Sequence, residues 1–242
     1  VTGVQTCALP IFMEDFSGIL AVGEVADGKL AAVSLELLAP GRQLADVRGE
    51  PLSIVLVHRA AEACAQDAIA HGADRVYVIA DAPTEHYEGT SHADILERLC
   101  TDTAKPAVVL LGQTASGRDL APRIAFRLRT GLVTDCLRLQ VDSESKNLIA
   151  TKPVSGGNIL ATYSIAGDGP QVATIRRRAV ESLDRDDGRQ GETVSLPCGV
   201  DSSAVKVKVV DRVIEEASEG PTLETAEIVV SGGRGFENVE DF

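Results

Sequence analysis

The sequence contains no long apolar stretch and little positive charge. No apolar run approaches the roughly 18 residues that a membrane-spanning helix requires, so the sequence predicts no membrane insertion. Lysine and arginine together number 23 against 36 acidic residues, and the formal net charge is -13. Because a nucleic-acid-binding surface needs a concentrated positive face for the phosphates, this charge argues against a nucleic-acid partner.

Residue patterns for metal binding and for hydrolysis are also missing. The five cysteines are odd in number, widely spaced and form no CxxC pair, and the four histidines show no HExxH spacing. The cysteines therefore indicate reduced residues in an intracellular protein, and we expect no metal site and no disulfide framework. The sequence also has no Gly-x-Ser-x-Gly elbow, no Walker phosphate loop and no GxGxxG after its first strand, so no catalytic residue is assigned.

In the first half of the chain, short strand-like runs alternate with helical ones. This alternation is typical of a mainly parallel sheet with crossover helices, and it predicts a three-layer, Rossmann-like α/β domain. Gly72 is expected to end one helix in a left-handed conformation, and Ser91 with Asp94 is expected to form a capping box. The predicted strands are residues 19–25, 53–57, 75–79 and 108–112, and the predicted helices are residues 35–47, 60–71, 93–101 and 119–129.

After Thr130 the chain becomes richer in β-branched residues and in turn residues. Short β runs broken by Asp, Asn and Gly predict hairpins added to the sheet. These runs are residues 137–141, 148–152, 159–164 and 172–175; residues 184–191 are expected to be a loop, residues 205–213 a further strand and residues 215–221 a linker.

Residues 111–129 read as a strand, a Gly/Thr/Ser-rich loop and a helix. Such a loop can hold a phosphate, because free N–H groups and the helix dipole point at it. Ser116 followed by Asp119 also reads as an ordinary capping box. An α/β module that binds AMP or ATP through residues Thr114 to Asp119 therefore stays open as an alternative function, and a purely structural interaction domain as another.

A second candidate site lies near the end of the chain, where the strand-like run of residues 226–230 leads into Ser231, Gly232, Gly233, Arg234 and Gly235. Small residues after a strand let backbone N–H groups approach an anionic or planar ligand, and Arg234 places one fixed cation beside them. The simpler interpretation is a glycine-rich turn without a ligand.

Five stretches of the sequence carry a resemblance to a known family. In order, they are LGQTASGRDLAPRIA at residues 111–125, TGLVTDC at 130–136, KPVSGGN at 152–158, GPQVATIR at 169–176 and IVVSGGRG at 228–235. These stretches resemble the electron transfer flavoprotein alpha subunit. The resemblance covers residues 16–242, while the family's later Gln-Thr-Gly and Gly-Ile-Ser-Gly-Ala-x-Gln-His segments are not found, so the chain looks like a fragment.

The resemblance implies an electron carrier that converts no substrate itself. It implies a heterodimer with a beta subunit and one FAD, bound here by Ser231, Gly232, Gly233, Arg234 and Gly235, with the site incomplete in this chain. It further implies electron donors such as acyl-CoA dehydrogenases of fatty acid beta-oxidation and a quinone reductase or another acceptor. The expected compartment is the bacterial cytoplasm, or the mitochondrial matrix in a eukaryote.

The expected domain organisation follows from the same matching region. The only methionine is Met13, and residues 1–12 match no part of the family, so we expect them to be a non-native leader. Residues 13–205 are the expected α/β domain, residues 206–221 a connecting strand and linker, and residues 222–242 the first strand and turn of an incomplete flavin domain. Residues 236–242 depart from the family pattern after Arg234.

Overall fold

The computed structural model describes residues 16–82, 86–165 and 169–200, and then residues 205, 207, 210, 226, 228–233 and 235. The chain divides into two compact units, one up to Val207 and one from Lys208, and each is described by itself. The expected leader of residues 1–12 and the linker of residues 215–221 lie outside the described residues. Of the expected strand at residues 205–213, Val205, Val207 and Val210 are described, and none of them is in a strand.

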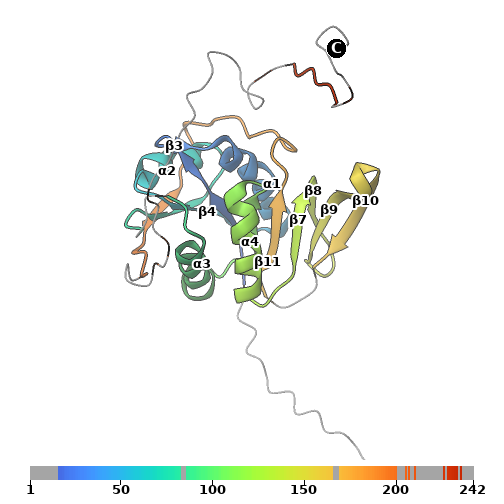
Figure 1. The fold of residues 1–242 in the computed structure, drawn as a ribbon. Helices are drawn as coiled ribbons and strands as arrows, with labels where there is room; N and C mark the ends of the chain where they lie inside the picture. Colours follow the sequence, from blue (N-terminus) through green and yellow to red (C-terminus); the bar gives the residue numbers. More distant parts are fainter. Residues whose placement is uncertain are drawn as a thin grey trace, which may run out of the picture. The chain divides into compact units, whose positions relative to one another are not determined.

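Within the described residues, seven strands of the first unit form one sheet (Figure 1). Every neighbouring pair runs parallel. This confirms the α/β, Rossmann-like prediction. From one edge to the other, the strands are β12 (Glu192–Ser195), β5 (Arg75–Ile79), β4 (Leu52–Val57), β1 (Ile19–Gly23), β6 (Val108–Gly112), β11 (Gln171–Ile175) and β7 (Leu132–Cys136).

The strand order reverses between β1 and β6. From β1 the chain proceeds to β4 and β5 on one side, and it then returns to β6 on the other side of β1. In doubly wound sheets, ligands usually bind outside the carboxyl ends of the strands at this point of reversal. The ends of β1 and β6 are therefore the first place to look for a site in this unit.

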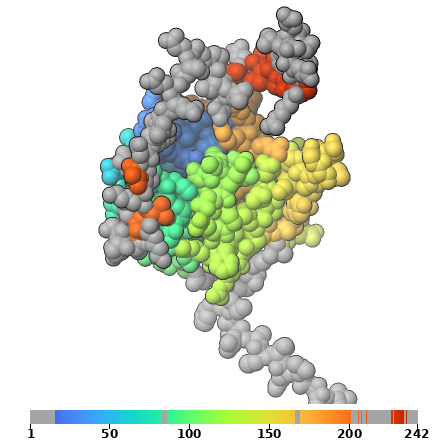
Figure 2. Space-filling model, in the orientation of Figure 1, coloured from blue at the N-terminus to red at the C-terminus, as the bar shows by residue number. Residues whose placement is uncertain are grey.

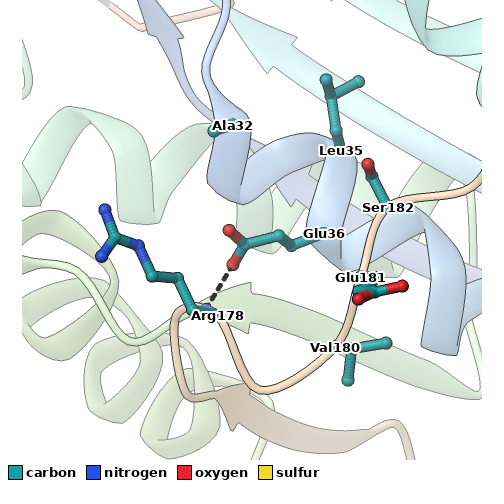
Figure 3. Close-up of a pocket in the computed structure, with 7 residues that line it drawn as sticks. All are labelled: Ala32, Leu35, Glu36, Arg178, Val180, Glu181 and Ser182. Atoms are coloured by element: carbon teal, nitrogen blue, oxygen red, sulfur yellow. Dashed lines mark hydrogen bonds between the residues drawn. The ribbon is translucent and has the colours of Figure 1, made fainter. Parts of the chain in front are cut away.

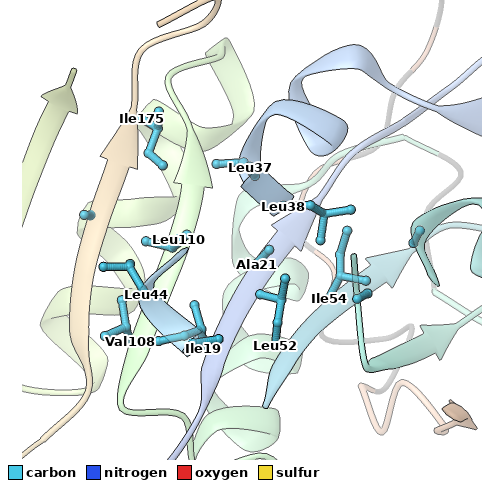
Figure 4. Close-up of a cluster of buried hydrophobic side chains, with 14 of the residues drawn as sticks. Ile19, Ala21, Leu37, Leu38, Leu44, Leu52, Ile54, Val108, Leu110 and Ile175 are labelled. Atoms are coloured by element: carbon cyan, nitrogen blue, oxygen red, sulfur yellow. The ribbon is translucent and has the colours of Figure 1, made fainter. Parts of the chain in front are cut away.

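Helices cover both faces of the sheet, as three layers require. Successive side chains of a strand point to opposite faces, and β1 shows this clearly. Ile19 and Ala21 belong to a buried cluster with α1 (Ala32–Arg48) and α2 (Ala61–Ala70), part of which Figure 4 shows. Leu20 and Val22 belong to a second cluster with α3 (Gly89–Arg98), its π-helical continuation Leu99–Thr103, and α4 (Ala115–Arg127).

A smaller antiparallel sheet is attached beside β7. It contains β8 (Arg138–Val141), β9 (Leu148–Val154) and β10 (Ile159–Ser164), with the short 3-10 turn Ser155–Gly157 between β9 and β10. Leu139, Leu148 and Ala150 are buried in the same cluster as the leucines of α1. This sheet matches the predicted hairpins, and a two-stranded hairpin of β2 (Val25–Ala26) and β3 (Lys29–Leu30) follows β1.

The prediction of hairpins is wrong for residues 172–175. These residues lie in β11, which is inserted between β6 and β7 as a parallel strand of the main sheet. All five residues of β11 are buried, as expected for a strand covered on both faces. The short run gives no sign of this, because pairing partners distant in the sequence decide it.

Both predicted capping boxes are wrong by a few residues, although the helices exist. α3 begins at Gly89, and the Glu88 carboxylate accepts hydrogen bonds from the N–H groups of Thr90 and Ser91. α4 begins at Ala115, and Thr114 caps it instead of Ser116. The end predicted at Gly72 is confirmed, since this glycine has a φ of 110° and donates its N–H to the carbonyl of Ile69.

In the part of the chain that the structure describes, no helix is long and apolar enough to cross a membrane.

Candidate functional site

The glycine-rich turn of the second unit is described at four of its five predicted ligand-binding residues. Ser231, Gly232, Gly233 and Gly235 are exposed and lie outside helices and strands, whereas Arg234 lies outside the described residues. A Cβ atom placed on Gly233 or Gly235 would have no described atom within 4 Å. The turn thus offers a hydroxyl and backbone N–H groups, a donor set whose chemistry fits an anionic or planar cofactor. No described side chains enclose these donors at Gly233 and Gly235.

The strand predicted before this turn is not formed in its described residues. Ala226 and residues 228–230 are in no strand, and Ile228, Val229 and Val230 are 83%, 53% and 76% exposed. A strand is stable only when neighbouring strands pair with it and another layer covers its apolar face. No described strand pairs with this run, so its apolar sequence alone is not enough.

Where the strand order of the first unit reverses, the N-terminus of α4 is already occupied by contacts within the chain. The Thr114 hydroxyl accepts the N–H of Gly117 at 3.0 Å and donates to the Glu24 carboxylate at 2.5 Å. A Cβ on Gly117 would come within 1.9 Å of the Gly112 carbonyl oxygen, so only glycine allows this close approach of helix and strand. The loop that was a candidate phosphate site is therefore used for packing and capping.

Glu24 lies directly after β1, at the position where a bound anion would meet the start of α4. Its backbone N–H donates to the Ser34 hydroxyl at 2.7 Å, and that hydroxyl donates back to the Glu24 carbonyl at 2.9 Å. Burial raises the pKa of the Glu24 carboxyl, while the hydrogen bond from Thr114 and the charge of Arg177 act in the opposite direction. A carboxylate here repels a phosphate, which argues against the AMP or ATP alternative.

A group of cations surrounds Asp135 at the carboxyl ends of β7 and β11. Arg176 binds Asp135 with two hydrogen bonds, Nε to Oδ1 at 2.9 Å and Nη2 to Oδ2 at 2.6 Å. These bonds lower the pKa of Asp135 despite its partial burial, and the charges of Lys152 and Arg118 lower it further. Arg176 and Asp135 thus form an ion pair that joins the ends of two neighbouring strands.

A shallow pocket of about 440 Å³ lies between α1 and the segment after β11 (Figure 3). The Glu36 carboxylate, which lines it, accepts the backbone N–H of Arg178 at 2.8 Å. Glu36 therefore holds the segment after β11 against α1, and we assign no ligand to the pocket. The lining residues are Ala32, Leu35, Glu36, Arg178, Val180, Glu181 and Ser182.

The described residues show no other sign of a ligand. None of their His, Cys, Asp and Glu side chains form a group of three or more suited to a metal ion. Every buried side-chain nitrogen or oxygen among them has a hydrogen-bond partner. The four described cysteines are free, and three of them, Cys64, Cys100 and Cys136, are buried.

Sequence reasoning did not find Glu24 and Asp135. A usable signal exists for Glu24, because a carboxylate directly after the first strand of a parallel sheet lies at its carboxyl end. Asp135 carries no such signal, since its partner Arg176 is 41 residues away and β11 brings the two together only in the folded sheet.

Comparison with known proteins gives one consistent family. A family model for the electron transfer flavoprotein domain matches residues 19–198. The chain is 36% identical over 230 residues to the electron transfer flavoprotein subunit alpha of Megasphaera elsdenii, covering 95% of this chain and 68% of the relative. It is 37% identical to the subunit of the same name from Thermoanaerobacterium thermosaccharolyticum, covering 95% of this chain and 69% of the relative.

A differently named relative agrees with this result. Protein FixB of Azotobacter vinelandii is 36% identical over 220 residues, covering 89% of this chain and 60% of the relative. The matched region spans the parallel sheet and its helices, and the alignments with both alpha subunits extend over nearly the whole chain. The chain therefore belongs to the electron transfer flavoprotein family, among its alpha subunits.

Proposed function

We propose that the chain acts as the alpha subunit of an electron transfer flavoprotein. In this role it carries electrons from flavoprotein dehydrogenases, such as acyl-CoA dehydrogenases, to a quinone reductase or another acceptor, and it converts no substrate. The observation that carries the proposal is the exposed donor set at Ser231, Gly232, Gly233 and Gly235. In the first unit, by contrast, Glu24 and Thr114 occupy the place at the ends of β1 and β6 where a ligand would bind. The relatives come from bacteria, so the proposed compartment is the cytoplasm.

FAD is the proposed cofactor, and it supplies the reversible uptake of electrons when bound. The backbone N–H groups of Gly232, Gly233 and Gly235 would donate hydrogen bonds to it, and the Ser231 hydroxyl would donate one more. Arg234 would add a permanent positive charge, which favours the more negative, reduced form of the cofactor. A beta subunit is the proposed partner, with the first unit as scaffold and subunit interface.

A titration with FAD tests the cofactor assignment. Because a site normally encloses roughly 70 to 90% of a ligand of this size, we expect the 242-residue chain alone not to retain FAD. The chain extended to the full length of its relatives, mixed with a beta subunit, should bind one FAD and turn yellow. Stoichiometric FAD uptake at micromolar concentration by the chain alone would contradict this expectation.

The role of Arg234 is tested in the flavin-loaded complex. Arg234→Ala should lower the reduction potential of the flavin, because a positive charge beside it is lost. Arg129→Ala is the matched control, since Arg129 is an exposed arginine just after α4 and forms no ion pair with another described residue. Equal reduction potentials in the Arg234→Ala variant and the unaltered complex would contradict the assignment of Arg234 to the flavin site.

A further inference from the structure

The edge segment, residues 176–200, contains no buried residue. Every one of its residues is exposed or half-buried, whereas all five residues of β11 directly before it are buried. The segment consists of a crossover, the edge strand β12 and the residues after β12. In Figure 2 the orange stretch that includes β11 and the start of this segment reaches the surface above the green α4. Its apolar contacts with the second buried cluster come from the half-buried residues Val194, Leu196, Cys198 and Val200.

The crossover, residues 176–191, passes across the sheet without forming a helix or a strand. It connects β11 to β12, and four strands of the sheet, β6, β1, β4 and β5, lie between them. Because all neighbouring strands are parallel, the crossover also returns from the carboxyl end of the sheet to its amino end. Such a return usually contains a helix that packs on the sheet. Figure 1 shows it instead as a narrow orange ribbon.

Polar contacts hold the middle of the crossover against α2. The backbone N–H of Asp186 donates to the carbonyl of Ala70 at 2.9 Å. Arg185 forms an ion pair with Asp67, and the two side chains are 49% and 33% exposed. Salt screens an ion pair that is exposed to this degree, so this attachment depends on ionic strength.

A second ion pair holds the end of the crossover, where it meets β12. Arg189 Nη2 donates to Asp74 Oδ1 at 2.6 Å, and the carbonyl of Asp74 accepts the backbone N–H of Glu192 at 2.9 Å. The other carboxylate oxygen of Asp74 accepts hydrogen bonds from Arg42 at 2.7 Å and from the backbone N–H of Leu52 at 2.8 Å. Asp74 is therefore fixed by α1 and β4, and Arg189 is the movable partner of this pair.

We propose that the edge segment opens as one local unit while the rest of the sheet stays folded. Local opening costs least where few buried apolar contacts are lost, and the edge segment has no buried residue. The second unit begins at Lys208. Opening adds the edge segment to the tether before that unit, and a flexible chain of about 25 residues spans roughly 25 to 30 Å. The opening needs no cofactor, so it stands or falls independently of the proposed function.

Hydrogen exchange of single amides, followed by NMR in the 242-residue chain, tests this opening. The amides of Asp186, Glu192 and Leu196 each donate to a carbonyl outside the edge segment. They should exchange at similar opening free energies, and at least about tenfold faster than the amides of β1 and β6. Raising the salt from about 0.05 M to about 0.5 M should speed their exchange about threefold, because both ion pairs are screened, and should leave β1 and β6 unchanged.

Two substitutions test the ion pairs. Arg185→Ala and Arg189→Ala each remove one pair, and each should speed exchange of the three edge-segment amides about threefold. Arg177→Ala is the matched control, because Arg177 is an exposed arginine of the same crossover and forms no ion pair with another described residue, and it should change these rates by less than about twofold. Unchanged exchange in β1 and β6 shows that each variant keeps its core.

Each outcome bears on the proposal. Joint, salt-sensitive exchange of the three amides ahead of the core, faster in both arginine variants, supports the local opening. Exchange of the three amides only at the rate of β1 and β6 would mean that the edge segment opens with the whole unit, and the proposal would be wrong. Three fast but unrelated rates, unaffected by salt and by the two substitutions, would show independent fraying and would also overturn it.

Discussion

At the scale of single residues, Glu24 is held in a position that does not favour a carboxylate. Burial beside the start of α4 raises its pKa above the ordinary value of 4.5. A carboxyl whose pKa is higher in the folded state contributes most stability below the unfolded pKa, and this contribution is lost as the pH rises through the folded pKa. At neutral pH the charged form of Glu24 therefore costs stability, although Thr114 donates a hydrogen bond to it.

Glu24→Gln should raise the free energy of unfolding at pH 7 by about 1 kcal/mol, because glutamine keeps an acceptor for Thr114 without the buried charge. The gain should shrink as the pH falls toward 4.5, where Glu24 itself becomes neutral. Urea unfolding between pH 4.5 and pH 8 measures both effects. Glu62→Gln on the exposed side of α2 is the control. A gain that does not depend on pH would show that the charge of Glu24 is not the cause.

At the scale of elements, the sequence predicts the parallel strands and the helices well but not where the helices start. Ser91 and Ser116 both have the spacing of a capping residue, yet Glu88 and Thr114 cap the two helices. The spacing is ambiguous because several polar residues stand close together in the sequence, and only the folded chain shows which of them meets the free N–H groups. The position of β11 between β6 and β7 is hidden for a similar reason, since it depends on pairing across the fold.

The assignment of Thr114 as the cap of α4 makes a stability prediction. Thr114→Ala should lower the free energy of unfolding by about 1 kcal/mol or more, because Gly117 loses its acceptor and Glu24 loses its donor. Ser116→Ala should change it by less than about 0.5 kcal/mol, because Ser116 does not cap the helix. The two variants are compared by urea unfolding at pH 7. The opposite order would restore the capping box predicted from the sequence.

At the scale of the whole molecule, the two buried clusters belong entirely to the first unit. Their fully buried members lie between Ile19 and Ile175, and their half-buried neighbours extend to Val200. The sequence predicts this α/β unit because its alternating pattern is local and strong. It does not predict the state of residues 226–230, because their apolar pattern forms a strand only beside partner strands.

We therefore propose that residues 13–207 fold without the rest of the chain. This truncated chain should unfold cooperatively, with a Tm within about 2 °C of the 242-residue chain, because no cluster residue is removed. Thermal unfolding followed by circular dichroism measures it. A broad, non-cooperative transition would mean that the second unit contributes to the first unit's stability.

The edge of the main sheet has a consequence for synthesis of the chain on the ribosome. β12 completes the sheet by pairing with β5, and the bond between Arg75 and Glu192 spans 117 residues. At a synthesis rate of about 5 to 20 residues per second, roughly 6 to 23 seconds pass between the synthesis of β5 and that of β12. During this interval a strand edge of the growing chain is open to other nascent chains, so the chain should be most prone to wrong strand pairing before β12 has been made.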